Sequence, residues 1–120
     1  MKIFLVIFSI LLSSNQQVDE IFIQSNNHYT NGNYEAALDG YFEIINSGFE
    51  SSELYFNLGN TFYKLNNIPE SNFYFEKALA ISPNDFDVIT NLSFAQNLRI
   101  DKIENLPVTQ IQNFKISILD

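Results

Sequence analysis

Cysteine is absent from this 120-residue chain, and cations are few: six Lys and Arg residues stand against 14 Asp and Glu residues, giving a net charge of −8. Without cysteine the chain forms no disulfide, builds no thiolate metal site and carries no lipid on an N-terminal cysteine. Binding to a nucleic-acid backbone requires clustered cations. The missing residue types therefore exclude disulfide scaffolds, thiolate metalloproteins and nucleic-acid binding before any motif is considered.

Residues that carry out chemistry are equally scarce. The chain has one histidine, His28, and a single imidazole does not build a metal site on its own. No glycine-rich phosphate loop, nucleophile elbow or cluster of metal ligands occurs in the sequence. We therefore expect a protein that is not an enzyme and that needs no metal or other cofactor.

The stretch from Ser52 to Asp85 has the pattern of two packed antiparallel helices. Large apolar residues recur at helical spacing, Gly59 leaves room for an aromatic ring of the partner helix, and Pro69 and Pro83 fit a helix start and a helix stop. The pattern is carried by Tyr55, Leu58, Gly59, Phe62, Phe75 and Ala78. In this it resembles the tetratricopeptide repeat, a helix–turn–helix unit, which implies protein binding rather than catalysis.

A shift by the repeat length of about 34 residues recovers the pattern on both sides. Upstream, Gly48 is expected to end a helix in the left-handed conformation, and His28 takes the place of Phe62, so we expect it to pack between helices. The other upstream equivalents are Ile21, Ser25, Ala37, Tyr41 and Ile44. Downstream, only a first helix follows. The predicted fold is an all-α solenoid with one repeat at 18–51, a second at 52–85 and a capping helix at 86–99.

Residues 1–14 form a separate segment, in which Lys2 precedes an almost unbroken apolar run that ends at Ser13 and Ser14. This arrangement resembles a bacterial secretory signal peptide. The run is shorter than the ~20 residues that a membrane-spanning helix needs. We expect export and cleavage, with an uncleaved N-terminus tethered to the membrane as the alternative. Both place the protein in the periplasm or at the inner membrane.

In a solenoid of this class the first helices of the repeats line a concave surface. The predicted partner-binding groove consists of Phe22, Asn26, Tyr29, Phe56, Asn60, Tyr63 and Phe94, with Thr90 and Asn97 beside Phe94 on the third helix. Aromatic rings give contact area at low entropic cost, and Asn side chains bond an extended peptide backbone. The alternative is that these aromatics pack between helices or are covered by the rest of a larger protein.

Charge is distributed unevenly. The first repeat holds six acidic residues and no Lys or Arg, which is either a solvated surface or a site for a basic partner. Where repeats that clamp acidic chaperone tails have cations, this chain has Asp19, Phe22 and Glu53. A chaperone-tail clamp is therefore excluded.

Residues 100–120 differ in character from the repeats. We expect a linker that ends in a proline break at Pro107, followed by a short amphipathic helix formed by Ile111, Phe114, Ile118 and Leu119. This helix either docks on the last repeat helix or is the remnant of something longer.

Three segments carry a narrower resemblance: the turn at Asn31 to Leu38, the run from Ser47 to Asn60, and the linker from Arg99 to Pro107. Together they resemble BatE-type proteins of the Bacteroidetes aerotolerance operon. The resemblance implies an envelope scaffold that works beside von Willebrand factor A-type proteins and a MoxR-type ATPase. Members of that family continue into membrane-spanning helices and an SH3-like domain, which do not follow here.

Two functions remain after these exclusions. One is a protein–protein interaction scaffold whose groove holds a peptide or a partner protein. The other is a structural unit of an oligomer or larger assembly without a ligand of its own.

Overall fold

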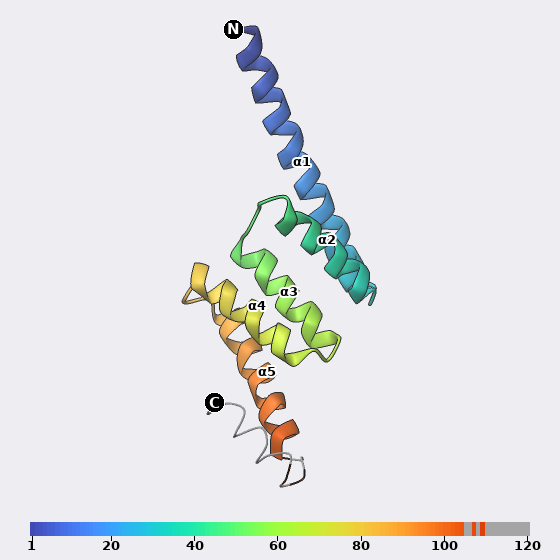
Figure 1. Cartoon of the computed structure of the whole chain (residues 1–120), viewed down its shortest axis with the longest axis vertical. Helices are drawn as coiled ribbons and strands as arrows, with labels where there is room; N and C mark the ends of the chain where they lie inside the picture. The colour runs from blue at the N-terminus through green and yellow to red at the C-terminus, as the bar shows by residue number, and fades with distance from the viewer. Residues whose placement is uncertain (105–106, 108, 110–120) are drawn as a thin grey trace.

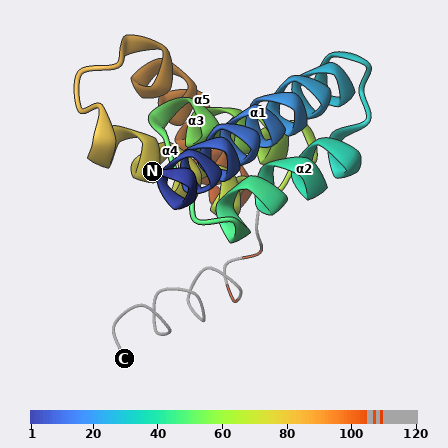
Figure 2. The same ribbon diagram turned by 90° about the horizontal axis from the view of Figure 1, so that it is seen from above.

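The computed structural model describes residues 1–104, 107 and 109, apart from the side chains of residues 11, 12 and 102–104. The described residues form five helices and no strand (Figure 1): α1 (Lys2–Thr30), α2 (Tyr34–Asn46), α3 (Ser52–Lys64), α4 (Ile68–Ile81) and α5 (Phe86–Glu104). Helix α1 packs against α2, α3 against α4, and α4 against α5. Seen from above, α1 and α2 lie side by side at one end of the stack (Figure 2). The predicted all-α solenoid is confirmed.

The space predicted beside Gly59 is filled by Phe75. A Cβ atom added to Gly59 would lie 2.5 Å from Cδ1 and Cε1 of the Phe75 ring. The Ser71 hydroxyl donates a hydrogen bond to the Gly59 carbonyl oxygen at 2.8 Å, which fastens α4 to α3 at the same level. Since Leu58 and Phe75 are at most 1% exposed, this close approach is the centre of the second repeat.

The two helices of the first repeat also approach closely at a glycine, but here the glycine, Gly40, lies on the second helix of the pair, α2. Ser25 on α1 is buried and donates its hydroxyl to the Ile21 carbonyl oxygen at 2.7 Å. A Cβ atom on Gly40 of α2 would collide with the Ser25 hydroxyl. Gly40 therefore leaves room for Ser25 of α1, as Gly59 leaves room for Phe75 of α4.

The turns repeat as well. Gly32 and Asn66, which occupy equivalent positions, both have left-handed backbones with φ of +80° and +60°, because a tight helix–helix turn needs a residue that tolerates this region. Gly48 also has a positive φ, as predicted. The side chain of Ser51 caps α3 by accepting the Leu54 N–H at 3.0 Å. Pro69 lies in the first turn of α4, where its missing N–H is not needed.

Three aromatic rings join the two repeats. Phe42 of α2 lies 6.2 Å from Phe62 and 6.0 Å from Tyr74, and Phe62 stacks on Tyr74 at 5.6 Å. His28, the equivalent of Phe62, is exposed, so the prediction that it packs between helices is wrong. The ring of Phe62 is covered by Phe42 from a helix of the preceding repeat, whereas no helix among the described residues covers His28 in this way.

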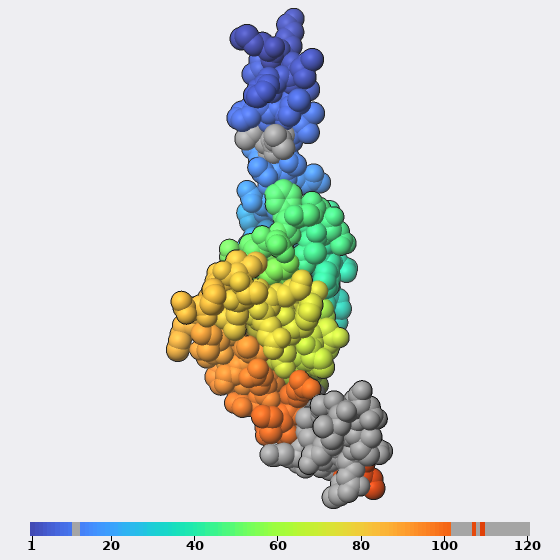
Figure 3. All heavy atoms as spheres, turned by 60° about the vertical axis from the view of Figure 1, so that its left-hand side comes forward, coloured from blue at the N-terminus to red at the C-terminus, as the bar shows by residue number. Residues whose placement is uncertain are grey.

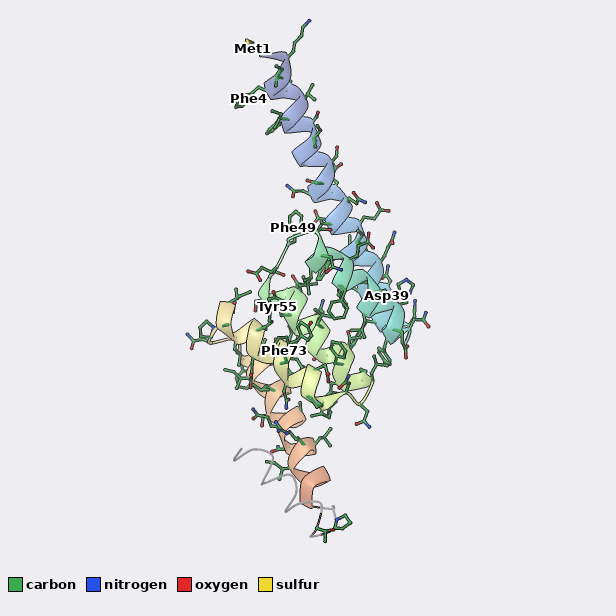
Figure 4. All side chains as sticks on the ribbon, in the orientation of Figure 1. Met1, Phe4, Asp39, Phe49, Tyr55 and Phe73 are labelled. Atoms are coloured by element: carbon green, nitrogen blue, oxygen red, sulfur yellow. The ribbon has the colours of Figure 1, made fainter. Side chains whose placement is uncertain are left out.

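The N-terminal segment continues into the first repeat as one helix. Helix α1 runs from Lys2 to Thr30 without a break, and its first turns protrude from the body of the molecule (Figure 3). The side chains of Met1 and Phe4 point into open space (Figure 4), and Ile3, Val6 and Ile10 are more than half exposed. Among the described residues, no helix combines the length and hydropathy needed to cross a membrane.

The last helix is longer than expected. Helix α5 ends at Glu104, five residues into the segment expected to be a linker, because no proline or glycine interrupts the sequence before Pro107. It begins at a side-chain cap, in which the Asp85 carboxylate accepts the N–H groups of Asp87 and Val88 at 3.1 and 3.3 Å. The predicted amphipathic helix around Phe114 lies outside the described residues.

Candidate functional site

Helices α1, α3 and α5, the first helices of successive repeats, share one face, which is hollowed at two adjoining places. One hollow has a volume of about 260 Å³ and the other about 280 Å³, and both are lined by Tyr29 and Asn60. The first hollow is completed by Tyr63, Lys64, Phe75, Asn91 and Phe94, and the second by Asn26, Thr30, Tyr41, Glu53 and Asn57. We call this double hollow the groove.

The structure places five of the seven residues predicted for partner binding in the groove: Asn26, Tyr29, Asn60, Tyr63 and Phe94. Phe94 is 57% exposed. The other two, Phe22 and Phe56, lie sideways against the second helices, with their ring centroids 6.0 Å from those of Tyr41 and Phe75 respectively. These two rings help to hold the helix pairs together and do not line the two hollows of the groove.

Hydrogen bonds between Asn side chains join the first helices across the groove. Asn57 Nδ2 donates to Asn26 Oδ1 at 3.0 Å, and Asn91 Nδ2 donates to Asn60 Oδ1 at 2.7 Å. The two bonds are equivalent, since each joins residues 31 positions apart in neighbouring repeats. Asn57 and Asn91 were not among the predicted groove residues. The signal that would have found them is the recurrence of Asn at the repeat spacing.

Tyr41 supports this network from the second helix. Its hydroxyl donates to Asn26 Oδ1 at 2.6 Å, so that oxygen accepts two hydrogen bonds. Burial, with a smaller contribution from the nearby Tyr29, raises the pKa of Tyr41 to about 12. The hydroxyl therefore stays protonated as a donor throughout the neutral range and fixes the orientation of the Asn26 amide.

The Asn pairs leave polar groups free for a ligand. In the part of the chain that the structure describes, no hydrogen bond uses the Nδ2 groups of Asn26 and Asn60 or the Oδ1 atoms of Asn57 and Asn91. An amide Nδ2 group donates two hydrogen bonds and its oxygen accepts two. The groove thus offers unused donors and acceptors between aromatic rings.

The ring of Tyr29 stands between the two hollows and is held in place. It makes an edge-on contact with Tyr34 of α2, with ring centroids 5.5 Å apart. Burial, followed by the effect of Tyr34, raises the pKa of the Tyr29 hydroxyl. A ring supported in this way loses little freedom when a ligand packs on it.

Beyond Glu53 a third hollow of about 230 Å³ lies next to the groove. Its apolar walls include Phe22 and Phe49, and its carboxylates belong to Asp19, Glu50 and Glu53. The Tyr55 hydroxyl donates to Glu50 Oε2 at 2.6 Å. This hydrogen bond, together with burial, raises the pKa of Tyr55 to about 12. We call this space the acidic hollow.

Within the described residues, no group of three or more His, Cys, Asp or Glu side chains is arranged to hold a metal ion.

Comparison with known proteins agrees with the geometry. Residues 52–85, which contain α3 and α4, match the family model of the tetratricopeptide repeat. A search of curated proteins found no match. The fold and the site together define an all-helical solenoid of the tetratricopeptide type. Repeats of this class generally mediate contacts between proteins on extended concave surfaces and are typically not catalytic.

Proposed function

We infer that the protein is a non-catalytic scaffold whose groove binds an extended peptide segment of a partner protein. One observation carries this proposal: two adjoining hollows lie across three successive first helices, and both combine aromatic rings with amide groups that have unused hydrogen-bonding capacity. Such a surface matches a peptide backbone, which presents a donor and an acceptor at each residue.

In this proposal the aromatic rings and the Asn amides of the groove contact different parts of the peptide. The rings of Tyr29, Tyr63 and Phe94 supply contact area for side chains of the peptide. The amides of Asn26 and Asn60 bond its backbone and fix its direction. Since the Asn pairs are already ordered by each other and by Tyr41, little side-chain entropy is lost on binding.

The test is selection of binding peptides from a random displayed library with the full chain as bait, followed by affinity measurements on a double variant, Tyr29→Ala with Tyr63→Ala. We expect the selected peptides to bind the variant at least about tenfold more weakly, because truncation of a central aromatic typically costs more than 1 kcal/mol. A matched control removes two exposed rings outside the groove, Phe73 and Phe86, and should bind as the wild type does. Equal binding by both variants, with helical circular dichroism retained, contradicts the groove assignment.

A finer proposal concerns the partner and the location. The resemblance of Asn31 to Leu38, Ser47 to Asn60 and Arg99 to Pro107 to BatE-type proteins supports an envelope complex with von Willebrand factor A-type proteins. The exposed apolar start of α1 supports export to the periplasm or attachment to the inner membrane. A pull-down from membrane and periplasmic fractions tests both points. Recovery of von Willebrand factor A-type proteins by the wild type, but not by the double variant, is the expected result.

Helix α5 supports a second candidate, a structural unit of a larger assembly. Its exposed apolar side chains are Phe86, Ile89, Phe94, Leu98 and Ile100, with exposed fractions from 37% to 76%. If another copy covers this face, the sedimentation coefficient should rise with protein concentration, and Ile100→Asp should abolish the rise. A chain that stays monomeric at every concentration contradicts this candidate.

A further inference from the structure

We propose that the segment bound in the groove is cationic and carries Lys or Arg at about every third residue. This inference rests on the proposed function and adds the chemistry of the partner. It follows from a row of three carboxylates at equivalent positions of the first helices, of which Glu53 lines the groove, and from the acidic hollow, which Asp19 and Glu53 both line.

The row consists of Asp19, Glu53 and Asp87, which occupy the same position in the three successive first helices. All three are exposed. In the part of the chain that the structure describes, no Lys or Arg forms an ion pair with any of them. Lys64, the cation that lines the groove, is eleven residues from Glu53 on the same helix, which places the two Cα atoms about 16 Å apart along the axis. The row therefore carries negative charge that no ion pair within the described residues balances.

The acidic hollow fits the shape of a long cationic side chain. Val18, Phe22 and Phe49 form apolar walls, while the carboxylates of Asp19, Glu50 and Glu53 lie around the same space. Lys and Arg bury their methylene stems along apolar surface and keep the charged group among polar groups. A cation already lies on aromatic rings elsewhere in the molecule, where the Lys77 ammonium is 5.1 Å from the centre of the Tyr55 ring and 5.3 Å from that of Phe73.

The spacing follows from the geometry of packed helices. The Asn57–Asn26 and Asn91–Asn60 hydrogen bonds hold successive first helices side by side. Helices in such contact have axes about 8–10 Å apart, so we take about that distance for successive carboxylates of the row. A segment in the polyproline II conformation advances ~3.1 Å per residue and returns to the same side every third residue, a repeat of about 9 Å. Cations at every third residue would therefore face the three carboxylates while the residues between them meet the rings and amides.

The experiment measures binding of three fluorescein-labelled peptides to the full chain by fluorescence anisotropy at about 0.15 M salt. The first repeats the triplet Lys-Leu-Asn over about 12 residues, or ~37 Å in polyproline II. The second has Gln in place of Lys, and the third has the composition of the first with its lysines in one block. We expect the first peptide to bind about tenfold more tightly than the other two, from roughly a twofold gain at each exposed carboxylate.

Two protein variants separate recognition from general attraction to an acidic protein. The groove variant is Asp19→Asn, Glu53→Gln and Asp87→Asn. The control variant is Asp39→Asn, Glu43→Gln and Glu76→Gln, which changes exposed acids of α2 and α4 and gives the same net charge; Asp39 lies on the outer side of α2 (Figure 4). The groove variant should lose the preference for spaced lysines, and the control variant should keep it.

Each other outcome overturns a defined part of the proposal. An equal loss in both variants shows attraction by net charge alone and overturns the cationic row. Equal binding of the spaced and block peptides overturns the spacing. If the Lys and Gln peptides bind equally and Tyr29→Ala with Tyr63→Ala abolishes both, the groove stands and the cationic preference is wrong. If no peptide binds the wild type while the library selection still yields peptides that bind the groove, this inference fails and the proposed function stands.

Discussion

Replacing Gly59 with Ala should destabilise the protein, although Ala is the better helix former. The gain in helix propensity is about 1 kcal/mol. Against it, the new Cβ atom would lie 2.5 Å from two atoms of the Phe75 ring. That ring is 1% exposed and lies next to the Phe56 ring, with 6.0 Å between centroids. Overpacking a core costs about 1–3 kcal/mol, and a ring held this tightly belongs at the upper end, so we expect a net loss of about 2 kcal/mol.

The assay is urea unfolding of the full chain followed by far-ultraviolet circular dichroism, with a melting temperature about 10 °C lower as a second readout. A double-mutant cycle with Phe75→Leu identifies the cause. If the contact with the ring is responsible, Gly59→Ala combined with Phe75→Leu should be at least 1 kcal/mol more stable than the two single effects predict. Unchanged or increased stability of Gly59→Ala would refute the close approach of α3 and α4.

Three further perturbations test other parts of the structure by urea unfolding. Tyr41 has a pKa of about 12 in the folded protein and 10 as its ordinary value, so its contribution to stability is present below pH 10 and is lost as the pH rises to about 12. Tyr41→Phe should flatten this loss between about pH 10 and 12, and an equally steep loss in both proteins contradicts the burial argument. Asn57→Ala removes the bond to Asn26 and should cost about 1 kcal/mol; no change would mean that the Asn pair does not hold the repeats together. Ser51→Ala removes the cap on the Leu54 N–H and should cost about 1 kcal/mol, whereas Ser51→Asp should retain most of the stability.

Local sequence patterns were sufficient to predict the inside of each repeat. The fit of an aromatic ring beside Gly59, the left-handed Gly48 and the position of Pro69 each depend on a few residues of one helix pair. Such features follow from the size of a residue and the freedom of its backbone, and both are known from the residue type alone.

Features that depend on neighbouring repeats were harder to predict. His28 takes the position of Phe62, yet it is exposed, because burial at this position requires a preceding helix. The Asn57–Asn26 and Asn91–Asn60 bonds arise only when two first helices lie side by side. Sequence periodicity places these residues on a face, but only the packing of one repeat on the next determines their partners.

The start of the first repeat helix was also difficult to predict from the sequence. The apolar run after Lys2 suggested a separate segment, and its sequence gives no sign of where the first repeat helix begins. In the structure both belong to α1, since no proline or glycine occurs between them to end a helix.

Binding of a peptide across α1, α3 and α5 is tested most directly by nuclear magnetic resonance. The isotope-labelled full chain is titrated with a selected peptide, and the chemical shifts of its backbone amides are followed. We expect the shifts to concentrate on groove residues such as Asn26, Tyr29, Asn60 and Tyr63, and the outer faces of α2 and α4 to stay unchanged. Shifts confined to α2 and α4, or to the exposed apolar face of α5 away from the groove, would contradict this expectation.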